Sequence, residues 1–252
     1  MKTTISDKNV VTTISPASRE KLLLLLRRLG PIANVPRLGR YRNMSGEEIW
    51  SQMVSDVCAM GSARGMESMG KDHQLKAEFA QATSLTAWEQ RRFAQDYLAE
   101  VLKRFSATRF PRKAAEKLRL IVDAPTAVKR SRVVLLNDLP TSRDPNVIRD
   151  ELIKRCPAFR LKSASVFMIA LGLSHNVIAL DTRVVGALQQ HLAYNLKVGR
   201  VQGSKPIYLS VEAKLRDVCK QAGSSLATLD QTLFQFTSMS AVEYVMRAHG
   251  GI

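Results

Sequence analysis

Two residues near the middle of the chain have the types and the spacing to do chemistry on a shared substrate. Lys162 opens an apolar helical pattern, and Asp181 follows nineteen residues later. The stretch between them predicts a helix that ends near Leu171, a short apolar connector, and a second helix for which Asp181 is a natural N-cap. Two helices joined in this way can bring an amine and a carboxylate into one cleft.

Lys162 is a candidate nucleophile. A lysine amine attacks carbon only after it loses its proton, and the ordinary lysine pKa is about 10.4. In the first turn of a helix, the positive end of the helix dipole and partial burial both favour the neutral amine. The alternative is a solvated lysine that pairs with Asp150 or Glu151.

Asp181 is the matching carboxylate. An ionised group in a cleft of low dielectric can activate the amine and stabilise positive charge that develops on a reacting carbon. The alternative is a helix cap and nothing more. The two roles are compatible, because an N-cap holds its carboxylate in one rotamer, and we expect Asp181 to fill both.

Both residues lie in blocks that resemble the core of the helix-hairpin-helix (HhH-GPD) DNA glycosylase superfamily. The blocks are residues 161–165 and 180–184, where the superfamily carries a nucleophilic lysine and a catalytic aspartate. Four further blocks resemble segments of the superfamily and occur in the same order along the chain. They are residues 47–50, 58–64, 109–114 and 229–234. The last two resemble the compact 8-oxoguanine branch. The resemblance implies an all-α fold of two lobes with a cleft between them.

The resemblance also implies a reaction. A bifunctional DNA glycosylase and AP lyase would excise a damaged purine, with 8-oxoguanine as the first substrate to try. Lys162 would attack C1′ of a flipped nucleotide, expel the base and form a Schiff base, and β-elimination of the 3′ phosphate would follow. No metal or other cofactor is expected. Two alternatives stay open: a glycosylase for another modified base, for example in invading phage DNA, and a basic module that binds DNA without catalysis.

Three residues are predicted by the resemblance to bind the base. Phe234 stands where the branch offers an aromatic ring to the damaged purine, and such a stack contributes roughly 1–3 kcal/mol. Asp230 could accept from purine N–H groups, and Ser62 completes the set. The alternative for Phe234 is core packing with Phe236.

Contacts with DNA are predicted from the same blocks. Met60 stands where relatives carry an Asn or Gln that enters the gap left by the flipped base, and an apolar wedge is a recognised substitute. A core methionine is the alternative. In the hairpin, Ala158 and Arg160 occupy the positions of the two glycines in the family's Gly-x-Gly, which let backbone amides approach a phosphate closely. We therefore expect this hairpin to bind phosphate in an altered way. The other predicted DNA contacts are Ser165, Arg109, Arg112 and Lys113.

The composition agrees with a polyanionic partner. The 252 residues carry 38 Lys and Arg against 22 Asp and Glu, a net charge of +16 that favours nucleic acid. Cys58, Cys156 and Cys219 are too few and too scattered for a disulfide framework, a zinc site or an iron–sulfur cluster. The longest apolar run, residues 22–26, is too short to cross a membrane. We expect a cytoplasmic monomer that binds double-stranded DNA with a modified base or an abasic site.

Helical periodicity dominates the chain, and strand signals are almost absent. Residues 1–17 are expected to form a disordered tail, and residues 18–252 to form the two lobes. The middle lobe is predicted at about 71–180, and the other lobe is predicted to combine the N- and C-terminal helices. Residues 196–206 are predicted to form a basic loop. The predicted helices are 18–29, 46–61, 72–82, 85–105, 111–137 with a break near Pro125, 145–155, 161–171, 182–194, 209–222, 226–237 and 239–248.

Overall fold

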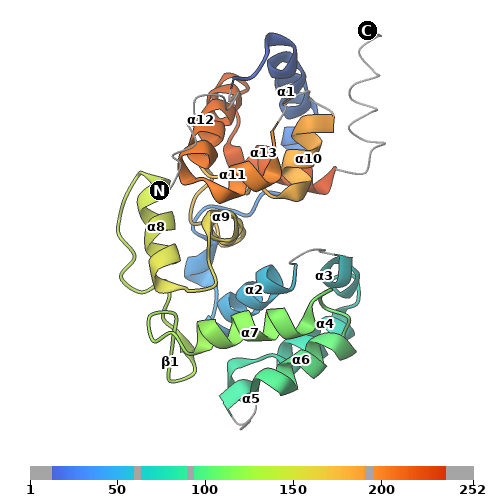
Figure 1. Ribbon diagram of the computed structural model, residues 1–252, viewed down its shortest axis with the longest axis vertical. Helices are drawn as coiled ribbons and strands as arrows, with labels where there is room; N and C mark the ends of the chain where they lie inside the picture. The colour runs from blue at the N-terminus through green and yellow to red at the C-terminus, as the bar shows by residue number, and fades with distance from the viewer. Residues whose placement is uncertain (1–12, 60–63, 90–93, 191–193, 195, 237–252) are drawn as a thin grey trace, which may run out of the picture. The chain divides into compact units, whose positions relative to one another are not determined.

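The computed structural model describes residues 13–59, 64–89, 94–190, 194 and 196–236, and the regular elements within these are helices apart from one small antiparallel ladder (Figure 1). The chain divides into two compact units. Unit 1 combines Met1–Pro36 with Ser174–Ile252, and unit 2 is Arg37–Leu173. The N- and C-terminal helices thus share one unit, and unit 2 begins at residue 37, whereas the middle lobe predicted at about 71–180 stays a prediction.

Unit 2 packs its helices around α2 and α7. The two helices contact each other, α7 also contacts α6, and α2 also contacts α9. Trp50 of α2 is almost fully buried, and its ring meets Trp88 edge-on at 6.4 Å between centroids. The elements are η2 (Arg40–Asn43), α2 (Gly46–Cys58), α3 (Arg64–Met69), α4 (His73–Ala82), α5 (Leu85–Glu89), α6 (Ala94–Arg104), α7 (Pro111–Val122), β1 (Val128–Lys129), β2 (Arg132–Val133), α8 (Pro145–Arg155) and α9 (Leu161–Ala170).

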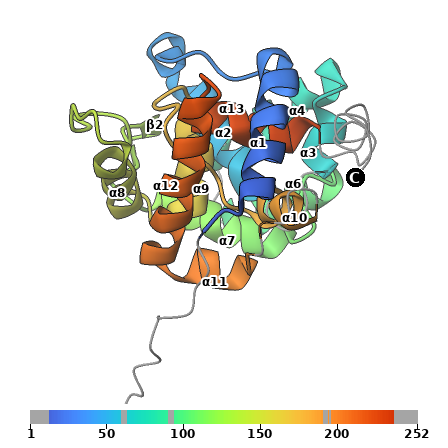
Figure 2. The ribbon, with the colours of Figure 1, turned by 90° about the horizontal axis from the view of Figure 1, so that it is seen from above.

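Unit 1 is built around α13, which contacts α1, α10 and α12. Figure 2 shows α1 and α12 next to each other, and they are also in contact. Leu22 and Leu25 of α1 are fully buried, as are Val211 and Leu215 of α12. The elements are α1 (Pro16–Leu29), η1 (Gly30–Ile32), α10 (Thr182–Gln190), α11 (Val198–Gly203), α12 (Lys205–Gln221) and α13 (Leu226–Gln235).

Local signals set several helix ends as the sequence predicts. Ser45 and Glu48 form a capping box at the start of α2. Asp144 caps α8 through the amide of Asn146 at 2.9 Å, with Pro145 at the first helical position. After α9, Gly172 has φ +66, and a Cβ there would lie 2.0 Å from the carbonyl oxygen of Arg37, so only glycine fits this helix end.

Other predicted elements are wrong. The helix predicted over 111–137 ends at Val122, and the chain then forms the β1–β2 ladder, whose turn has positive φ at Arg130 and Ser131. The predicted loop 196–206 contains α11 and the start of α12. The N-terminal helix begins at Pro16, two residues before the predicted 18. Residues 1–12 and the predicted helix 239–248 lie outside the described residues.

The structure also describes the three cysteines and the length and apolar character of the helices. Cys58, Cys156 and Cys219 are free and buried, and burial raises the pKa of each thiol to about 12, so none is a reactive thiolate. No helix in the described ranges combines the length and the apolar character needed to cross a bilayer.

Candidate active site

Lys162 is the second residue of α9, the later helix of an α8–α9 hairpin in unit 2. Its side chain is half-buried. The turn before it is fixed by the backbone N–H of Arg160, which donates to Ser163 Oγ at 2.8 Å. The predicted position of the lysine in the first turn of a helix is therefore confirmed. Its role as a nucleophile stays a prediction.

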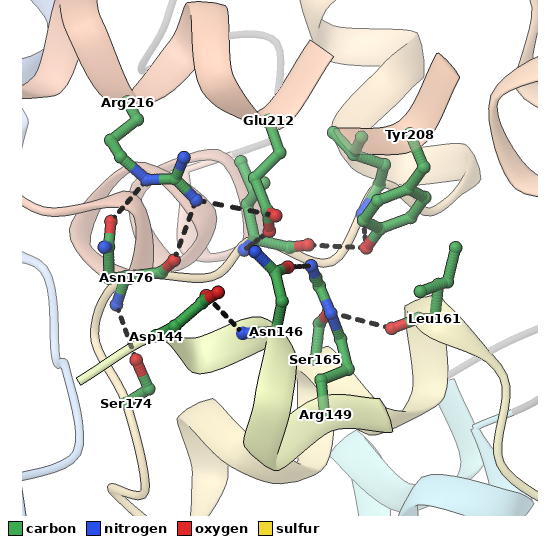
Figure 3. A network of polar contacts seen from close by, with 12 residues as sticks. Asp144, Asn146, Arg149, Leu161, Ser165, Ser174, Asn176, Tyr208, Glu212 and Arg216 are labelled. Atoms are coloured by element: carbon green, nitrogen blue, oxygen red, sulfur yellow. Dashed lines mark hydrogen bonds and ion pairs between the residues drawn. The ribbon is translucent and has the colours of Figure 1, made fainter. Parts of the chain in front are cut away.

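The hairpin is braced by a buried arginine. Arg149 of α8 is fully buried and donates to Ser165 Oγ at 3.0 Å and to Asn146 Oδ1 (Figure 3). Ser165 Oγ in turn donates to the carbonyl oxygen of Leu161 at 2.8 Å. These bonds hold the first turns of α8 and α9 together. Ser165 is itself fully buried, which speaks against the predicted contact of its side chain with DNA.

The turn between the hairpin helices lies at the surface. Ala158 is half-buried, and Arg160 is exposed. The Arg160 guanidinium donates through Nη1 to the carbonyl oxygens of Phe159 at 2.8 Å and Pro157 at 3.3 Å. The arginine thus folds back over the turn, and a contact with phosphate would use its other N–H groups. Contacts of Ala158 and Arg160 with DNA stay predictions.

Cations surround the nucleophile candidate. Lys117 of α7 is half-buried, and its pKa is lowered first by burial and then by the charges of Lys162 and Arg160. The three cations repel one another, so this part of unit 2 is strongly positive. Such a field attracts phosphate groups.

Unit 2 also holds a carboxylate that sequence reasoning missed, and the charge of Lys162 acts on it. Asp56 of α2 is half-buried, and its Oδ1 accepts from Gln52 Nε2 at 2.8 Å. Burial raises the pKa of the Asp56 carboxyl to about 7, although the hydrogen bond from Gln52 and the charge of Lys162 act in the opposite direction. The local signal was weak, because an acidic residue at the flank of an amphipathic helix is usually solvated.

Asp181, the other predicted catalytic residue, lies in unit 1. It is half-buried, and its Oδ1 accepts from the backbone N–H of Val184 at 2.8 Å, so its role as N-cap of α10 is confirmed. Because Lys162 and Asp181 belong to different units, their meeting in one cleft stays a prediction.

The connector before Asp181 has no regular structure, and buried side chains satisfy its backbone. Tyr208 of α12 donates its hydroxyl to the Ile178 carbonyl oxygen at 2.6 Å and accepts from the Leu180 N–H at 3.2 Å. Glu212 Oε1 accepts from the Ile178 N–H at 3.1 Å. Both side chains are almost fully buried. In Figure 3, Glu212 is also paired with Arg216, at 3.6 Å.

Asp230 of α13 belongs to the same scaffold. Its Oδ1 accepts from the backbone N–H of Ala179 at 2.7 Å, and its Oδ2 accepts from Gln231 Nε2 at 3.1 Å. The carboxylate is buried. Asp230 therefore holds the chain two residues before Asp181, which is a role the sequence did not predict. Its predicted contact with the base stays a prediction.

Phe234 of α13 lies beside the start of α10. Its ring is half-buried, and the Arg183 guanidinium lies over it at 4.3 Å from the centroid. This cation–π contact joins the aromatic candidate to a residue two positions after Asp181. A base that stacks on Phe234 would therefore use the opposite face of the ring or displace Arg183.

The predicted basic contacts Arg109, Arg112 and Lys113 are all exposed and lie around the start of α7. They surround Phe110, which is 40% exposed, and both Arg109 and Lys113 approach its ring, at 5.5 and 5.7 Å. Arg112 and Lys113 also line a hollow between α6 and α7. The other two predicted contacts, Met60 and Ser62, lie outside the described residues.

No family model matches the chain. An 8-oxoguanine DNA glycosylase/AP lyase of Korarchaeum cryptofilum is 28% identical over 199 residues, which are 77% of this chain and 81% of that protein. The Methanocaldococcus jannaschii 8-oxoguanine glycosylase/lyase, solved in complex with 15mer DNA containing 8-oxoguanine, has a TM-score of 0.61 at 19% identity and covers 87% of this chain and 96% of its own. The Thermotoga maritima 8-oxoguanine DNA glycosylase has a TM-score of 0.52 at 20% identity, with coverage of 88% and 90%.

These likenesses confirm the all-α helix-hairpin-helix glycosylase fold that the sequence predicts. The chain is therefore similar in sequence and in fold to 8-oxoguanine DNA glycosylases, in agreement with the resemblance that the sequence predicts.

Proposed function

We propose that this protein is a bifunctional DNA glycosylase and AP lyase whose first substrate is 8-oxoguanine in double-stranded DNA. The observation that carries the proposal is Lys162 in the first turn of α9, on a braced hairpin, in a chain similar over most of its length to an enzyme with this activity. The net charge of +16 supports a DNA partner.

The reaction follows from the chemistry of a primary amine. Lys162 Nζ bonds to C1′ of the flipped nucleotide, the glycosidic bond breaks, and the purine leaves with its electron pair and takes up a proton. The covalent sugar then opens to a Schiff base, and loss of a proton from C2′ expels the 3′ phosphate. Asp181 stabilises the positive charge on the sugar, as a fixed carboxylate does in a preorganised site.

Phe234 and Arg183 are the residues that would recognise the damaged base. The ring of Phe234 supplies a stacking face for the purine, and Arg183 beside it supplies a fixed positive charge. The exposed cations at the start of α7 bind the DNA backbone.

The test is covalent trapping with borohydride, which reduces the Schiff base to a stable link between protein and DNA. Duplexes that contain 8-oxoguanine, other modified bases or a preformed abasic site are compared. We expect trapping on 8-oxoguanine and abasic DNA, and Lys162→Gln should abolish it without weakening DNA binding. The matched control is Lys154→Gln, an exposed lysine on the same hairpin whose side chain is 78% exposed.

Each outcome has a clear meaning. Trapping that survives in Lys162→Gln would assign the nucleophile to another amine. Excision of a different modified base, with 8-oxoguanine left intact, would keep the enzyme class and change the substrate. Binding without excision or trapping on any duplex would make the protein a non-catalytic DNA-binding module.

A further inference from the structure

Arg149 is a fully buried cation in unit 2 that the proposed reaction has not yet used. Removing a guanidinium from water is unfavourable, and a well-packed apolar side chain of similar volume often leaves a fold as stable or makes it more stable. Stability alone therefore gives little reason for an arginine at this position. The hydrogen-bond partners of Arg149 indicate what the side chain does.

One branch of the guanidinium leads to the backbone of Lys162. Nη1 of Arg149 donates to Ser165 Oγ at 3.0 Å, and Ser165 Oγ donates to the carbonyl oxygen of Leu161 at 2.8 Å (Figure 3). That carbonyl group and the N–H of Lys162 belong to the same peptide group, which is planar. Because this plane is held, the direction in which the Lys162 side chain leaves the backbone is constrained as well.

The direction of the Ser165 hydroxyl depends on Arg149. A serine hydroxyl has one proton to donate, whereas an arginine side chain donates hydrogen bonds and accepts none. Ser165 therefore accepts from Arg149 and gives its own proton to the Leu161 carbonyl oxygen. Without the arginine, this constraint on the hydroxyl would be lost.

A second branch anchors the guanidinium in the other helix of the hairpin. Nη2 of Arg149 donates to Asn146 Oδ1, and the backbone N–H of Asn146 donates to Asp144 Oδ1 at 2.9 Å. Asp144 is the N-cap of α8. The guanidinium thus joins the start of α8 to the first turn of α9, within one unit. The place of Lys162 relative to α8 depends on these bonds.

We propose that Arg149 is a positioning residue, which acts through Ser165 and the Leu161 carbonyl group to aim Lys162 Nζ at C1′ of the target nucleotide. This inference rests on the proposed function for its reaction. Displacing an attacking group by about 1 Å can slow a reaction by roughly a hundredfold. Since Arg149 is fully buried, breaking this chain of hydrogen bonds should slow the attack and leave DNA binding nearly unchanged.

Two substitutions break the chain at different points. Ser165→Ala removes the hydroxyl, and Arg149→Met removes the donor but keeps an unbranched, flexible side chain. The matched control is Thr83→Val in unit 2, which also removes a buried hydroxyl that donates to a carbonyl oxygen four residues earlier, that of Phe79 at 2.8 Å. Thermal melting checks that all three variants fold.

The first experiment needs no DNA. Amide hydrogen exchange is followed by mass spectrometry on peptides that span the first turn of α9. Ser165→Ala and Arg149→Met should both exchange faster there, because the turn loses a restraint, whereas Thr83→Val should not. Unchanged exchange at α9 in both variants would refute the claim that Arg149 and Ser165 hold this turn.

The second experiment measures single-turnover borohydride trapping on abasic DNA, with the protein in excess over a range of concentrations. The limiting rate reports the reaction, and the protein concentration at half that rate reports DNA binding. Ser165→Ala and Arg149→Met should lower the limiting rate by on the order of ten- to a hundredfold, with nearly unchanged DNA binding. The double variant should be no slower than the slower single variant, since both changes break the same chain. Thr83→Val should react at the rate of the unaltered protein.

The other outcomes overturn the proposal. Limiting rates that match the unaltered protein would show that the chain does not position the lysine. A loss confined to DNA binding, or rate losses that multiply in the double variant, would contradict an action of Arg149 through Ser165. Equal slowing in Thr83→Val would trace the effect to general destabilisation. If the unaltered protein traps no DNA, the proposed function fails, while the exchange experiment still decides whether Arg149 and Ser165 hold the turn that carries Lys162.

Discussion

Replacing Asp56 by asparagine should change how the stability of the protein depends on pH. The carboxyl has a pKa of about 7 in the folded protein against 3.8 for an ordinary aspartate, so the folded state holds its proton more tightly than the unfolded state does. For a raised carboxyl pKa, the full stability is present below the unfolded value and is lost as the pH rises toward the folded one. The difference of about 3 units corresponds to about 4 kcal/mol, at 1.36 kcal/mol per unit.

Most of this loss falls in an accessible range. Between pH 5 and pH 8, the linkage relation gives a loss of about 3 kcal/mol for this single group. The asparagine of the variant does not titrate, so the variant lacks this slope. The hydrogen bond from Gln52 can still form, because the new side chain keeps the oxygen that accepts it. Any cost of placing the amide in the enclosed Oδ2 position is constant with pH and cancels in the comparison.

Urea unfolding at pH 5, 6, 7 and 8 measures the effect. The quantity of interest is the stability of Asp56→Asn minus that of the unaltered protein, which should rise by about 3 kcal/mol from pH 5 to pH 8. Glu48, whose pKa is lowered by its hydrogen bonds to Ser45, also titrates, but it does so in both proteins and drops out. A stability difference that stays flat with pH would refute the assignment of a raised pKa to Asp56.

Three further predictions concern the residues around the proposed chemistry. Asp181→Asn should slow base excision by on the order of a hundredfold with little change in melting temperature, because Asn also caps helices. Phe234→Ala should lose excision of the lesion but keep lyase activity on a preformed abasic site, whereas a parallel fall of both activities and of the melting temperature would show a core role. Tyr208→Phe, which removes the hydroxyl between Ile178 and Leu180, should lower stability by about 1–3 kcal/mol and slow excision. In an Asp181→Asn background it should slow excision no further, and an additive loss there would disconnect Tyr208 from Asp181.

Features that depend on neighbouring residues were predictable from the sequence. Asp181 caps α10 as expected, and Ser45 and Asp144 cap the helices predicted from residues 46 and 145. A cap needs only a short polar side chain and the amides two or three residues further along the chain. The segment after Val122 was not predictable in the same way. Its chain reversal uses positive φ at Arg130, a conformation that sequence preferences assign to glycine or asparagine.

The roles that tertiary packing creates were missed. Asp230 was predicted from its place in a family block, but its partner, the amide of Ala179, lies 51 residues earlier in the chain. Asp56 carried no local signal, since its environment depends on how α2 packs in unit 2. The sequence showed both carboxylates, but it did not show the distant partner of Asp230 or the burial of Asp56.

The charges around Lys162 link DNA binding to catalysis. Burial, and then the charges of Lys162 and Arg160, lower the pKa of Lys117, so cations are concentrated at this part of unit 2. The same positive field draws phosphate toward the hairpin. The cations that would draw in the DNA backbone therefore lie in the same part of unit 2 as the amine that is proposed to attack C1′.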